Sequence, residues 1–523
     1  MSGGSDMKHI FIYGPPGSGK STIGKILAKH LELPFLDLDS EIERAADRTI
    51  PQIMDEQGEP VFRDLETAAL EKAVAGKASV IALGGGALLR DTNQACAESA
   101  GEVVLLETDL PTLLTRMKSA VGQRPLLAGD VEGKLIALIA RRHSHYESFG
   151  LRVTNEIEPP ESVAWEIQQK LGRLHVRGMG AGYDVLVKSG GLDGLGKMLK
   201  ERGLGGPVGL VSDSNVAPLY GEQVLRSVKE TGYDANLLTI PTGEHNKTFE
   251  TVMSLWRGFL EAGLDRKSTV VALGGGVTGD LVGFAASTFM RGIVWVGLPT
   301  SLLAMSDSSL GGKTGFDLPY GKNLVGAFHS PRLVLADPEV LRTLPEDEFR
   351  SGMAEVVKHG VISDPSLFTL CAAGTEAAKK DLADLVRRSM AVKIHVIEDD
   401  PFERGQRAAL NLGHTVGHAI ELVSGFRLRH GEAVAIGMVA EARLAERLGL
   451  AKNGLSIQIA DALQALGLPE EIPSDLSQAD ILKAMQVDKK KAAGVIRFAL
   501  PVAIGKVQTG VEVEDLSLIF AEA

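Results

Sequence analysis

The sequence predicts an α/β protein with two parallel-sheet domains followed by a mainly helical domain. Three observations indicate this class. Apolar strand patterns alternate with amphipathic helical patterns through roughly the first two thirds of the chain, several strands end in glycine clusters, and strand patterns become scarce after about residue 338. Glycine supplies 60 of the 523 residues, which suits the strand-to-helix turns of such folds. A chain of this length is expected to form two or three domains.

The first domain begins with a short apolar strand at residues 9–13, HIFIY, which runs into a glycine-rich turn. Ile23 and Leu27 lie at helical spacing after the turn, so an amphipathic helix follows. Further strands are predicted at 80–86 and 102–108, again in alternation with helices. This order predicts a parallel sheet covered by helices on both faces.

The domain boundaries follow from the loss and return of this alternation. The pattern fades near residue 169, and the next stretch is polar and glycine-rich with little periodicity. We therefore predict a first domain at 1–171, a linker at 172–182, a second α/β domain at 183–337 and a helical domain at 338–523. The strands predicted for the second domain lie at 183–190, 207–213, 235–241, 269–276 and 293–299, and two of the helices predicted for the third at 379–398 and 455–467.

Charge and cysteine content restrict the partners and the compartment. The formal net charge of −12 offers no general basic surface for nucleic acid or anionic lipid. Cys96 and Cys371 form no clustered motif, so a reducing cytoplasm is expected. The start of the chain does not read as a secretory leader. The most apolar long stretch, 281–305, is interrupted by Arg291 and Pro299, so no membrane span is expected.

A phosphate-binding loop follows the first strand. Residues 14–21 read GPPGSGKS and match GxxxxGK[ST], with a strand before and a helix after. Glycines let successive N–H groups surround phosphate oxygens, the lysine neutralises phosphate charge, and the serine hydroxyl ligates Mg²⁺. An ordinary glycine-rich turn is the alternative, and the motif does not identify the phosphoryl acceptor. The predicted ATP contacts are Gly14, Gly17, Ser18, Gly19, Lys20, Ser21 and Thr22.

Residues 7–170 resemble shikimate kinase in the motifs FLDLDSEIE, VFRDLE, QRPLL and RRHSHY and in a glycine triplet. The resemblance implies that two arginines bind the carboxylate of shikimate, because a planar guanidinium matches a carboxylate. Each residue alone has a plain alternative as a solvated charge or a helix cap. The implied shikimate contacts are Asp39, Arg63, Gly84, Gly85, Gly86 and Arg142, and the implied catalytic residues are Lys20, Asp39 and the lid residue Arg124, which also contacts ATP.

Asp37 and Asp39 are two residues apart, and we place both at a strand end, where they would share one face. By the resemblance, Asp37 holds Mg²⁺ together with Ser21, and Asp39 orients the shikimate hydroxyl that is phosphorylated. The first domain therefore requires Mg²⁺ with ATP.

From about residue 183 to the end the chain resembles 3-dehydroquinate synthase. The motif GGGVTGD at 274–280 supplies a glycine turn for a dinucleotide pyrophosphate, a signal that is weak alone. The motifs SDSN, PTGEHNK and LPTSLLAM strengthen the resemblance, which implies NAD as cofactor. The implied NAD contacts are Asp213, Asn215, Glu244, Lys247, Gly274, Gly275, Gly276, Asp280, Thr300, Ser301, Lys313 and Lys322.

Glu355, His414 and His430 predict a metal site, because two imidazoles and one carboxylate are a common ligand set for catalytic zinc. His418 lies four residues after His414 and would share its face of a helix, so spacing alone makes both of them ligands. The resemblance instead assigns Glu355, His414 and His430 to Zn²⁺ (or Co²⁺) and leaves His418 as a proton-transfer residue. Buried, hydrogen-bonded histidines are the alternative interpretation.

The resemblance also implies a substrate, 3-deoxy-arabino-heptulosonate 7-phosphate, which is oxidised by NAD⁺, loses phosphate by β-elimination, is reduced again and closes a carbocycle. Zinc can polarise the hydroxyl that is oxidised. His418, Lys313 and Asp307 are the implied catalytic residues. The implied contacts to the sugar phosphate are Arg291, Asp307, Lys313, Asn323, Lys358, Lys393, Arg407, Asn411, Lys489 and Lys490, the last two being the weakest assignments.

Three alternatives stay open at this point. The second half is also compatible with a metal-dependent polyol dehydrogenase, which has no use for a phosphate pocket, or with another sugar phosphate cyclase. The first half is also compatible with a non-catalytic, kinase-like module. Under the principal interpretation the partners are small molecules (ATP, shikimate and the heptulosonate phosphate), and the resemblance implies a homodimer through the synthase part.

Overall fold

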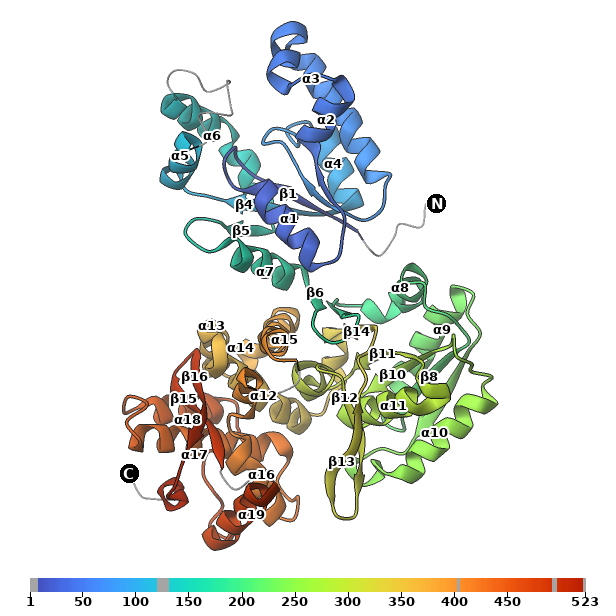
Figure 1. Cartoon of the computed structure of the whole chain (residues 1–523), viewed down its shortest axis with the longest axis vertical. Helices are drawn as coiled ribbons and strands as arrows, with labels where there is room; N and C mark the ends of the chain where they lie inside the picture. The colour runs from blue at the N-terminus through green and yellow to red at the C-terminus, as the bar shows by residue number, and fades with distance from the viewer. Residues whose placement is uncertain (1–7, 120–130, 402–404, 492–495, 521–523) are drawn as a thin grey trace. The chain divides into compact units, whose positions relative to one another are not determined.

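The computed structural model describes residues 8–119, 131–401, 405–491 and 496–520 (Figure 1). The chain divides into two compact units, Met1–His175 and Val176–Ala523. Short strand β6 (Arg173–Val176) lies at this junction, inside the segment expected to be a linker. Within the described ranges, no helix combines the length and the apolar character that crossing a bilayer requires.

A five-stranded parallel sheet forms the centre of the first unit. Its strands lie in the order β2 (Phe35–Asp37), β3 (Val80–Ala82), β1 (His9–Tyr13), β4 (Gly101–Glu107) and β5 (Arg152–Thr154). Alternate residues of β1 enter two different cores, with Phe11 on one face and Ile10 on the other. Both faces are therefore covered, as expected for a buried parallel strand. The helices are α1 (Lys20–His30), α2 (Leu38–Ala46), α3 (Ile50–Val74), α4 (Asp91–Ala100), α5 (Leu110–Ser119), α6 (Val131–Glu147) and α7 (Pro160–Leu171).

The second unit contains a larger parallel sheet. Six of its strands follow the order β7 (Tyr183–Val187), β14 (Leu333–Ala336), β11 (Val294–Pro299), β10 (Thr269–Gly274), β8 (Val208–Asp213) and β9 (Ala235–Ile240). The carboxyl ends of β8, β10 and β11 therefore lie side by side. Helices of this part are α8 (Leu195–Glu201), α9 (Glu222–Glu230), α10 (Phe249–Glu261) and α11 (Gly276–Thr288).

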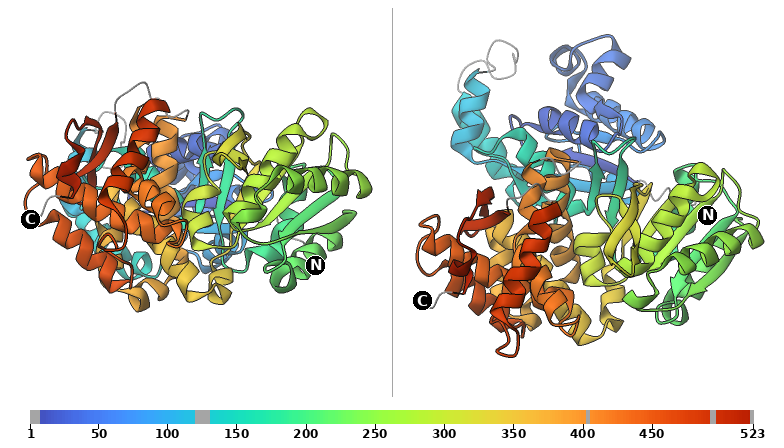
Figure 2. Two further views of the ribbon diagram at one scale, coloured as in Figure 1. Left: turned by 90° about the horizontal axis from the view of Figure 1, so that it is seen from below. Right: turned by 60° about the horizontal axis from the view of Figure 1, so that its bottom comes forward.

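The remainder of the second unit is mainly helical and packs around its own apolar core. Its elements are α12 (Glu346–Ser363), α13 (Pro365–Ala372), α14 (Thr375–Lys379), α15 (Leu382–Asp399), α16 (His414–Val423), α17 (His430–Arg447), α18 (Leu455–Ala465), α19 (Gln478–Lys491) and the antiparallel pair β15 (Arg497–Ala503) and β16 (Lys506–Glu512). A second antiparallel pair, β12 (Lys313–Leu318) and β13 (Gly321–Phe328), lies between the sheet and these helices (Figures 1 and 2).

Candidate active sites

The phosphate loop of the first unit connects β1 to α1. Gly19 is the last residue of the loop and has φ 87°. A larger residue at this position would collide with Asn155, because its Cβ would lie 2.7 Å from the Asn155 Nδ2. The Lys20 Nζ folds back over the loop and donates to the carbonyl oxygens of Gly14 at 3.0 Å and Pro15 at 2.9 Å. This geometry places an ammonium group and the free N–H groups of a helix start at one point, as an anion site requires.

The expected shared strand end for Asp37 and Asp39 is wrong. Strand β2 ends at Asp37, and Asp39 lies in the first turn of α2. The reason is helix capping, because the Asp37 carboxylate accepts the backbone N–H of Ser40 at 3.4 Å and starts the helix there. Asp37 also accepts a hydrogen bond from the Ser21 Oγ at 2.6 Å, so the two residues expected at Mg²⁺ do lie together.

The glycine triplet lies against the other residues expected to bind an acceptor. A Cβ on Gly84 would come within 2.7 Å of the Asp39 Oδ1, and one on Gly86 within 2.9 Å of both terminal nitrogens of Arg63. Only glycine leaves room for both side chains at this surface. The glycine triplet thus forms a surface with the Asp39 carboxylate at one end and the Arg63 guanidinium at the other.

Arg142 reaches the triplet from α6. It is buried, and its Nη1 donates to the Gly85 carbonyl at 2.6 Å, while the hydroxyl of Tyr146 donates to the same oxygen at 2.9 Å. The Arg142 Nε has no hydrogen-bond partner among the described residues. Arg142 is therefore held against the glycine triplet by its Nη1, while its Nε is buried.

Glu66 is an acidic neighbour that the motifs did not single out. It is almost fully buried and forms an ion pair with Arg63 at 2.8 Å. Burial raises the pKa of the Glu66 carboxyl, and the ion pair with Arg63 opposes that change. Arg63 is thus held toward the triplet by a partner on its own helix, three residues away.

Two further residues near the phosphate loop were missed. The Asn155 Nδ2 donates to the Ser18 carbonyl at 2.6 Å, and Arg116 donates to the carbonyls of Asn155 at 3.1 Å and Glu156 at 2.7 Å. The available signal was the position of Asn155 directly after β5, at the carboxyl edge of the sheet. Arg124 lies outside the described residues.

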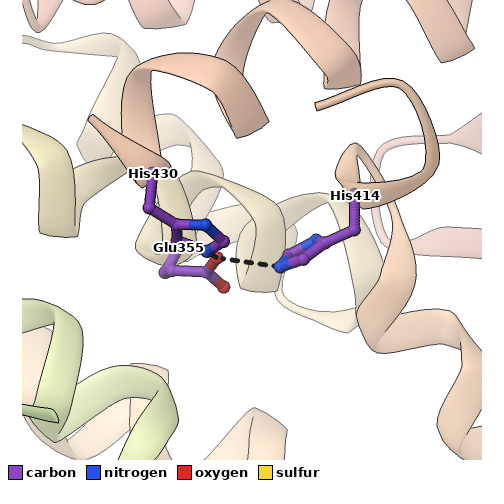
Figure 3. Close-up of side chains that lie close together, drawn as sticks. All are labelled: Glu355, His414 and His430. Atoms are coloured by element: carbon purple, nitrogen blue, oxygen red, sulfur yellow. Dashed lines mark ion pairs between the residues drawn. The ribbon is translucent and has the colours of Figure 1, made fainter. Parts of the chain in front are cut away.

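In the second unit, Glu355, His414 and His430 converge from three helices (Figure 3). Their ligand atoms all lie within 4.8 Å of one another. The Nε2 atoms of His414 and His430 are 3.5 Å and 3.6 Å from the same carboxylate oxygen, the Glu355 Oε1. The predicted trio is therefore brought together around one point.

The opposite nitrogen of each imidazole ring faces an oxygen atom. The Nδ1 of His414 is 3.1 Å from the Leu412 carbonyl, and the Nδ1 of His430 is 3.3 Å from the Glu421 Oε2. These oxygens favour a proton on Nδ1 and leave Nε2 free to bind a metal.

The donor set fits a divalent metal. Glu355 is fully buried, and among the described residues neither of its carboxylate oxygens has a hydrogen-bond partner, although Lys358 forms an ion pair with it. Two imidazole nitrogens and one such carboxylate are typical ligands of catalytic Zn²⁺ or Co²⁺, and the cavity beside them leaves open positions.

Burial would raise the pKa of the Glu355 carboxyl, but Lys358 and the two histidines outweigh it and hold that pKa well below its usual range. Burial and Lys358 hold the pKa of His414 well below its usual value, so this ring is neutral. Burial lowers the pKa of His430, yet the nearby carboxylates of Glu355 and Glu421 outweigh burial and raise it to about 9.

A cavity of about 690 Å³ opens beside the metal group. It is lined by residues from both the sheet part and the helical part of this unit. The predicted residues that line it are Glu244, Lys247, Gly276, Asp280, Asp307, Lys313, Lys322, Asn323, Lys358, Lys393, Arg407, Asn411, His414, His418 and His430.

The remaining dinucleotide residues lie at the adjoining carboxyl edge of the sheet. A Cβ on Gly274 would lie 3.1 Å from the Asp213 Oδ2, and the Gly274 carbonyl accepts the N–H of Thr300 at 3.0 Å. A Cβ on Gly275 would lie 3.6 Å from the Ser301 Oγ. Asn215 follows β8 at the same edge and donates from its Nδ2 to the Thr242 Oγ1 at 3.3 Å.

Three of the expected contacts are not placed in this cavity. Arg291 is exposed, has φ 70° and does not line it. Lys489 and Lys490 lie near the end of α19, and their side chains lie outside the described residues.

Acids and lysines pair across the cavity. Lys247 contacts Asp280 at 2.7 Å, Lys393 contacts the Asp307 Oδ1 at 2.6 Å, and Lys322 contacts the Glu421 Oε1 at 2.8 Å. Burial raises the pKa of Asp280 to about 6, although Lys247 opposes the shift. Pairing keeps both kinds of charge in a buried cavity, where an unpaired charge is costly.

Comparison with known proteins assigns both units. Residues 237–351 match the family model of the 3-dehydroquinate synthase N-terminal domain, residues 352–491 that of its C-terminal domain, and residues 16–172 that of shikimate kinase. The 3-dehydroquinate synthase of Nostoc punctiforme is 46% identical over 338 residues, which cover 63% of this chain and 93% of that protein.

Two solved structures resemble the second unit. A 2-epi-5-epi-valiolone synthase from Streptomyces hygroscopicus subsp. jinggangensis with NAD⁺ and Zn²⁺ bound has a TM-score of 0.59 at 30% identity, covering 64% of this chain and 93% of that one. A 2-deoxy-scyllo-inosose synthase complexed with carbaglucose-6-phosphate, NAD⁺ and Co²⁺ has a TM-score of 0.60 at 28% identity, covering 66% of this chain and 98% of that one.

Proposed function

The chain belongs to the 3-dehydroquinate synthase family and also carries a shikimate kinase domain, and from this premise we propose which residues perform each reaction. It is a bifunctional enzyme of the shikimate pathway. One unit phosphorylates shikimate with ATP, and the other converts 3-deoxy-arabino-heptulosonate 7-phosphate into 3-dehydroquinate and phosphate. The observation that supports the residue assignment best is the convergence of Glu355, His414 and His430 beside a basic cavity.

In the kinase unit, the loop 14–22 holds the ATP phosphates, and Lys20 leaves its carbonyl partners to neutralise their charge. Ser21 and Asp37 hold Mg²⁺, which screens phosphate charge when bound. Arg63 and Arg142 hold the shikimate carboxylate, and Asp39 orients the acceptor hydroxyl. The close approach of Asp39 and Arg63 to the glycine triplet supports this arrangement, because a ring lying on the triplet can reach both groups.

In the synthase unit, Glu355, His414 and His430 hold Zn²⁺ or Co²⁺, which supplies a Lewis acid when bound, and NAD supplies a hydride acceptor that is regenerated in each cycle. The glycines 274–276 and the residues of the adjoining sheet edge hold the dinucleotide. The basic residues of the cavity hold the phosphate ester. These comprise Lys313, Lys358, Lys393 and Arg407, with Asn323 and Asn411 as amide contacts.

Asp307, held by Lys393, faces the same cavity and orients the reacting carbohydrate. His418 lies exposed toward it, one helical turn beyond His414, and transfers protons. A polyol dehydrogenase has no phosphate group to bind and does not need this number of cations in its cavity. The cations therefore favour a phosphorylated substrate.

Replacing His418 with asparagine should lower synthase kcat by roughly 10²- to 10⁴-fold, the usual contribution of a general acid or base. Zinc content should stay near one per chain, because His418 is not one of the three proposed ligands. Steady-state kinetics and metal analysis on the same preparation check both expectations. Loss of zinc together with activity would make His418 a ligand and contradict the assignment.

Gly86→Ala should raise the KM for shikimate roughly 10- to 100-fold, because the new Cβ displaces Arg63 and weakens a charge-assisted hydrogen bond worth about 1.5–3 kcal/mol. The fold should tolerate the change, since the colliding atoms are the mobile end of an arginine. Gly150→Ala is the matched control, because a Cβ there meets no described atom within 4 Å. An unchanged KM in Gly86→Ala would contradict a role for Arg63 in shikimate binding.

The substrates are small molecules, and we also propose a homodimer formed by the synthase unit and a cytoplasmic site of action. The family resemblance supports the dimer, and Cys96 and Cys371, both free in the structure, support a reducing compartment. Light scattering of the purified chain tests the first proposal, with a monomer mass contradicting it. Fractionation of the source cells tests the second.

The two activities are tested directly by product identification. Purified protein should convert shikimate and ATP into shikimate 3-phosphate and ADP. In a separate mixture with NAD and Zn²⁺, it should convert the heptulosonate phosphate into 3-dehydroquinate. A different carbocycle in the second mixture would replace the synthase by another sugar phosphate cyclase. Failure of the first would leave the kinase unit as a binding module.

A further inference from the structure

The two helices that begin with metal-group histidines are linked in both directions. Helix α16 begins at His414 and carries Glu421, whose Oε2 lies 3.3 Å from the Nδ1 of His430, the first residue of α17. Helix α17 in turn carries Glu441, which accepts backbone N–H groups at the start of α16. Each helix thus holds the start of the other through a carboxylate.

Glu441 caps α16 from a distance. It is fully buried, its Oε2 accepts the N–H of Gly413 at 2.6 Å, and its Oε1 accepts the N–H of Val416 at 3.2 Å. A helix start leaves N–H groups unpaired, and the local cap position, Gly413, has no side chain that could accept them. Glu441 therefore takes the place of an ordinary N-cap and fixes the turn that carries His414.

The glycines between α16 and α17 leave these two helices little room to move relative to each other. Gly413 has φ 78°, and a Cβ there would lie 2.6 Å from the Met438 Cγ. A Cβ on Gly417 would lie 2.9 Å from the Ala433 carbonyl, and one on Gly437 would collide with the Gly413 carbonyl. The helix backbones are therefore in close contact, so a carboxylate that fixes one helix start also fixes its position relative to the other.

Glu421 joins the metal group to the β12–β13 pair. Its Oε1 contacts the Lys322 Nζ at 2.8 Å, and Lys322 projects from β13 over the Phe426 ring, 4.4 Å from the ring centroid. The other oxygen of Glu421 holds the Nδ1 of His430. The ring of His430 is therefore oriented with its Nε2 toward Glu355.

We propose that Glu421 and Glu441 are a reciprocal pair of positioning residues for the metal centre, which direct the Nε2 atoms of His430 and His414 toward Glu355 before a metal binds. Neither carboxylate is a ligand in this proposal. The inference rests on the proposed metal site and deepens it, because it gives a role to two acids that are not among the predicted substrate or cofactor contacts.

Removing either carboxylate should weaken metal binding without removing a ligand. Outer contacts of this kind typically contribute 10- to 100-fold to metal affinity. Glu441→Gln turns an amide NH₂ toward one of the two backbone N–H groups, so one helix-start donor loses its acceptor. Glu421→Ala removes both the contact to His430 and the closer of the two acidic partners of Lys322, the other being Glu244.

The experiment measures Zn²⁺ affinity of the full-length protein by competition with a chromophoric chelator, for the wild type, Glu421→Ala, Glu421→Gln and Glu441→Gln. His414→Ala serves as the variant without a site. Asp364→Asn is the matched structural control, because Asp364 is also a capping carboxylate, accepting the N–H of Leu367 at 3.0 Å and pairing with Arg388. The visible absorption of Co²⁺-loaded protein gives a second readout, since it reports ligand geometry.

We expect the Glu421 and Glu441 variants to bind Zn²⁺ about 10- to 100-fold more weakly than the wild type and to alter the Co²⁺ spectrum, with Asp364→Asn unchanged in both respects. Wild-type affinity in all of them would overturn the inference and leave the metal site intact. A change in only one position would overturn the reciprocal arrangement. Equal Zn²⁺ binding by the wild type and His414→Ala would instead overturn the metal site itself. If Glu441→Gln does not fold, the two Glu421 variants still test the proposal. Wild-type Zn²⁺ affinity and an unchanged Co²⁺ spectrum in both of them would refute it.

Discussion

Replacing His414 with alanine should abolish 3-dehydroquinate formation and leave shikimate phosphorylation at the wild-type rate. The substitution removes one of three proposed ligands, so zinc affinity should fall by more than about 100-fold, beyond the effect of an outer contact. The kinase reaction should persist because its residues belong to a separate compact unit with its own cores. Metal analysis and two independent product assays on one preparation check these expectations.

His395→Ala is the matched control for this prediction. His395 is a histidine of the same unit, but its side chain is 60% exposed and paired with Asp399 on α15, away from the lining of the cavity. It should retain zinc and both activities. A His414→Ala protein that still contains one zinc per chain and makes 3-dehydroquinate would exclude the proposed ligand set.

Lys20→Ala should have the largest effect on the kinase reaction, lowering kcat roughly 10²- to 10³-fold, comparable to the removal of one group that stabilises transition-state charge. The fold should be nearly unaffected, since the Lys20 ammonium donates to carbonyl oxygens of its own loop, those of Gly14 and Pro15. Cyclisation of the heptulosonate phosphate should continue at the wild-type rate. ADP release dependent on shikimate measures the first effect.

Lys29→Ala provides the comparison for Lys20. Lys29 lies on the same helix, α1, but is exposed near its end and far along the helix from the loop. It should phosphorylate shikimate like the wild type. Joint loss of both activities in Lys20→Ala would reveal coupling between the units and contradict their independence.

The parts of the sites that the sequence predicted are those with a local signature. The loop 14–21 combines a strand, glycines at fixed offsets and a helix, and in the structure Lys20 begins that helix and Ser21 donates to Asp37. The metal trio was predicted from residue type and family resemblance, and its members converge. Spacing alone would make His418 a ligand as well as His414, because a one-turn separation shows that two side chains share a face but not which nitrogen reaches a third residue; His418 also lies in a second possible metal group with Glu421 and His430.

The residues that the sequence did not reveal act over long distances in the chain. Glu441 caps a helix that begins 27 positions earlier, and a buried acid in an apolar helix has no pattern that identifies its partner. Asn155 supports a loop far away in sequence. We placed Asp39 on a strand because it lies two residues after Asp37, but the same spacing also occurs in loops. In the structure Asp37 caps α2, and Asp39 therefore lies in the first turn of that helix.

We propose that one polypeptide contains two independent active sites, only one of which needs a tightly chelated metal. The most direct measurement follows both products from a single preparation, with excess Mg²⁺ present, before and after treatment with 1,10-phenanthroline. We expect 3-dehydroquinate formation to stop and to return when Zn²⁺ is added, while shikimate 3-phosphate forms throughout. Synthesis of 3-dehydroquinate that survives complete removal of zinc, or loss of both products together, would contradict the account.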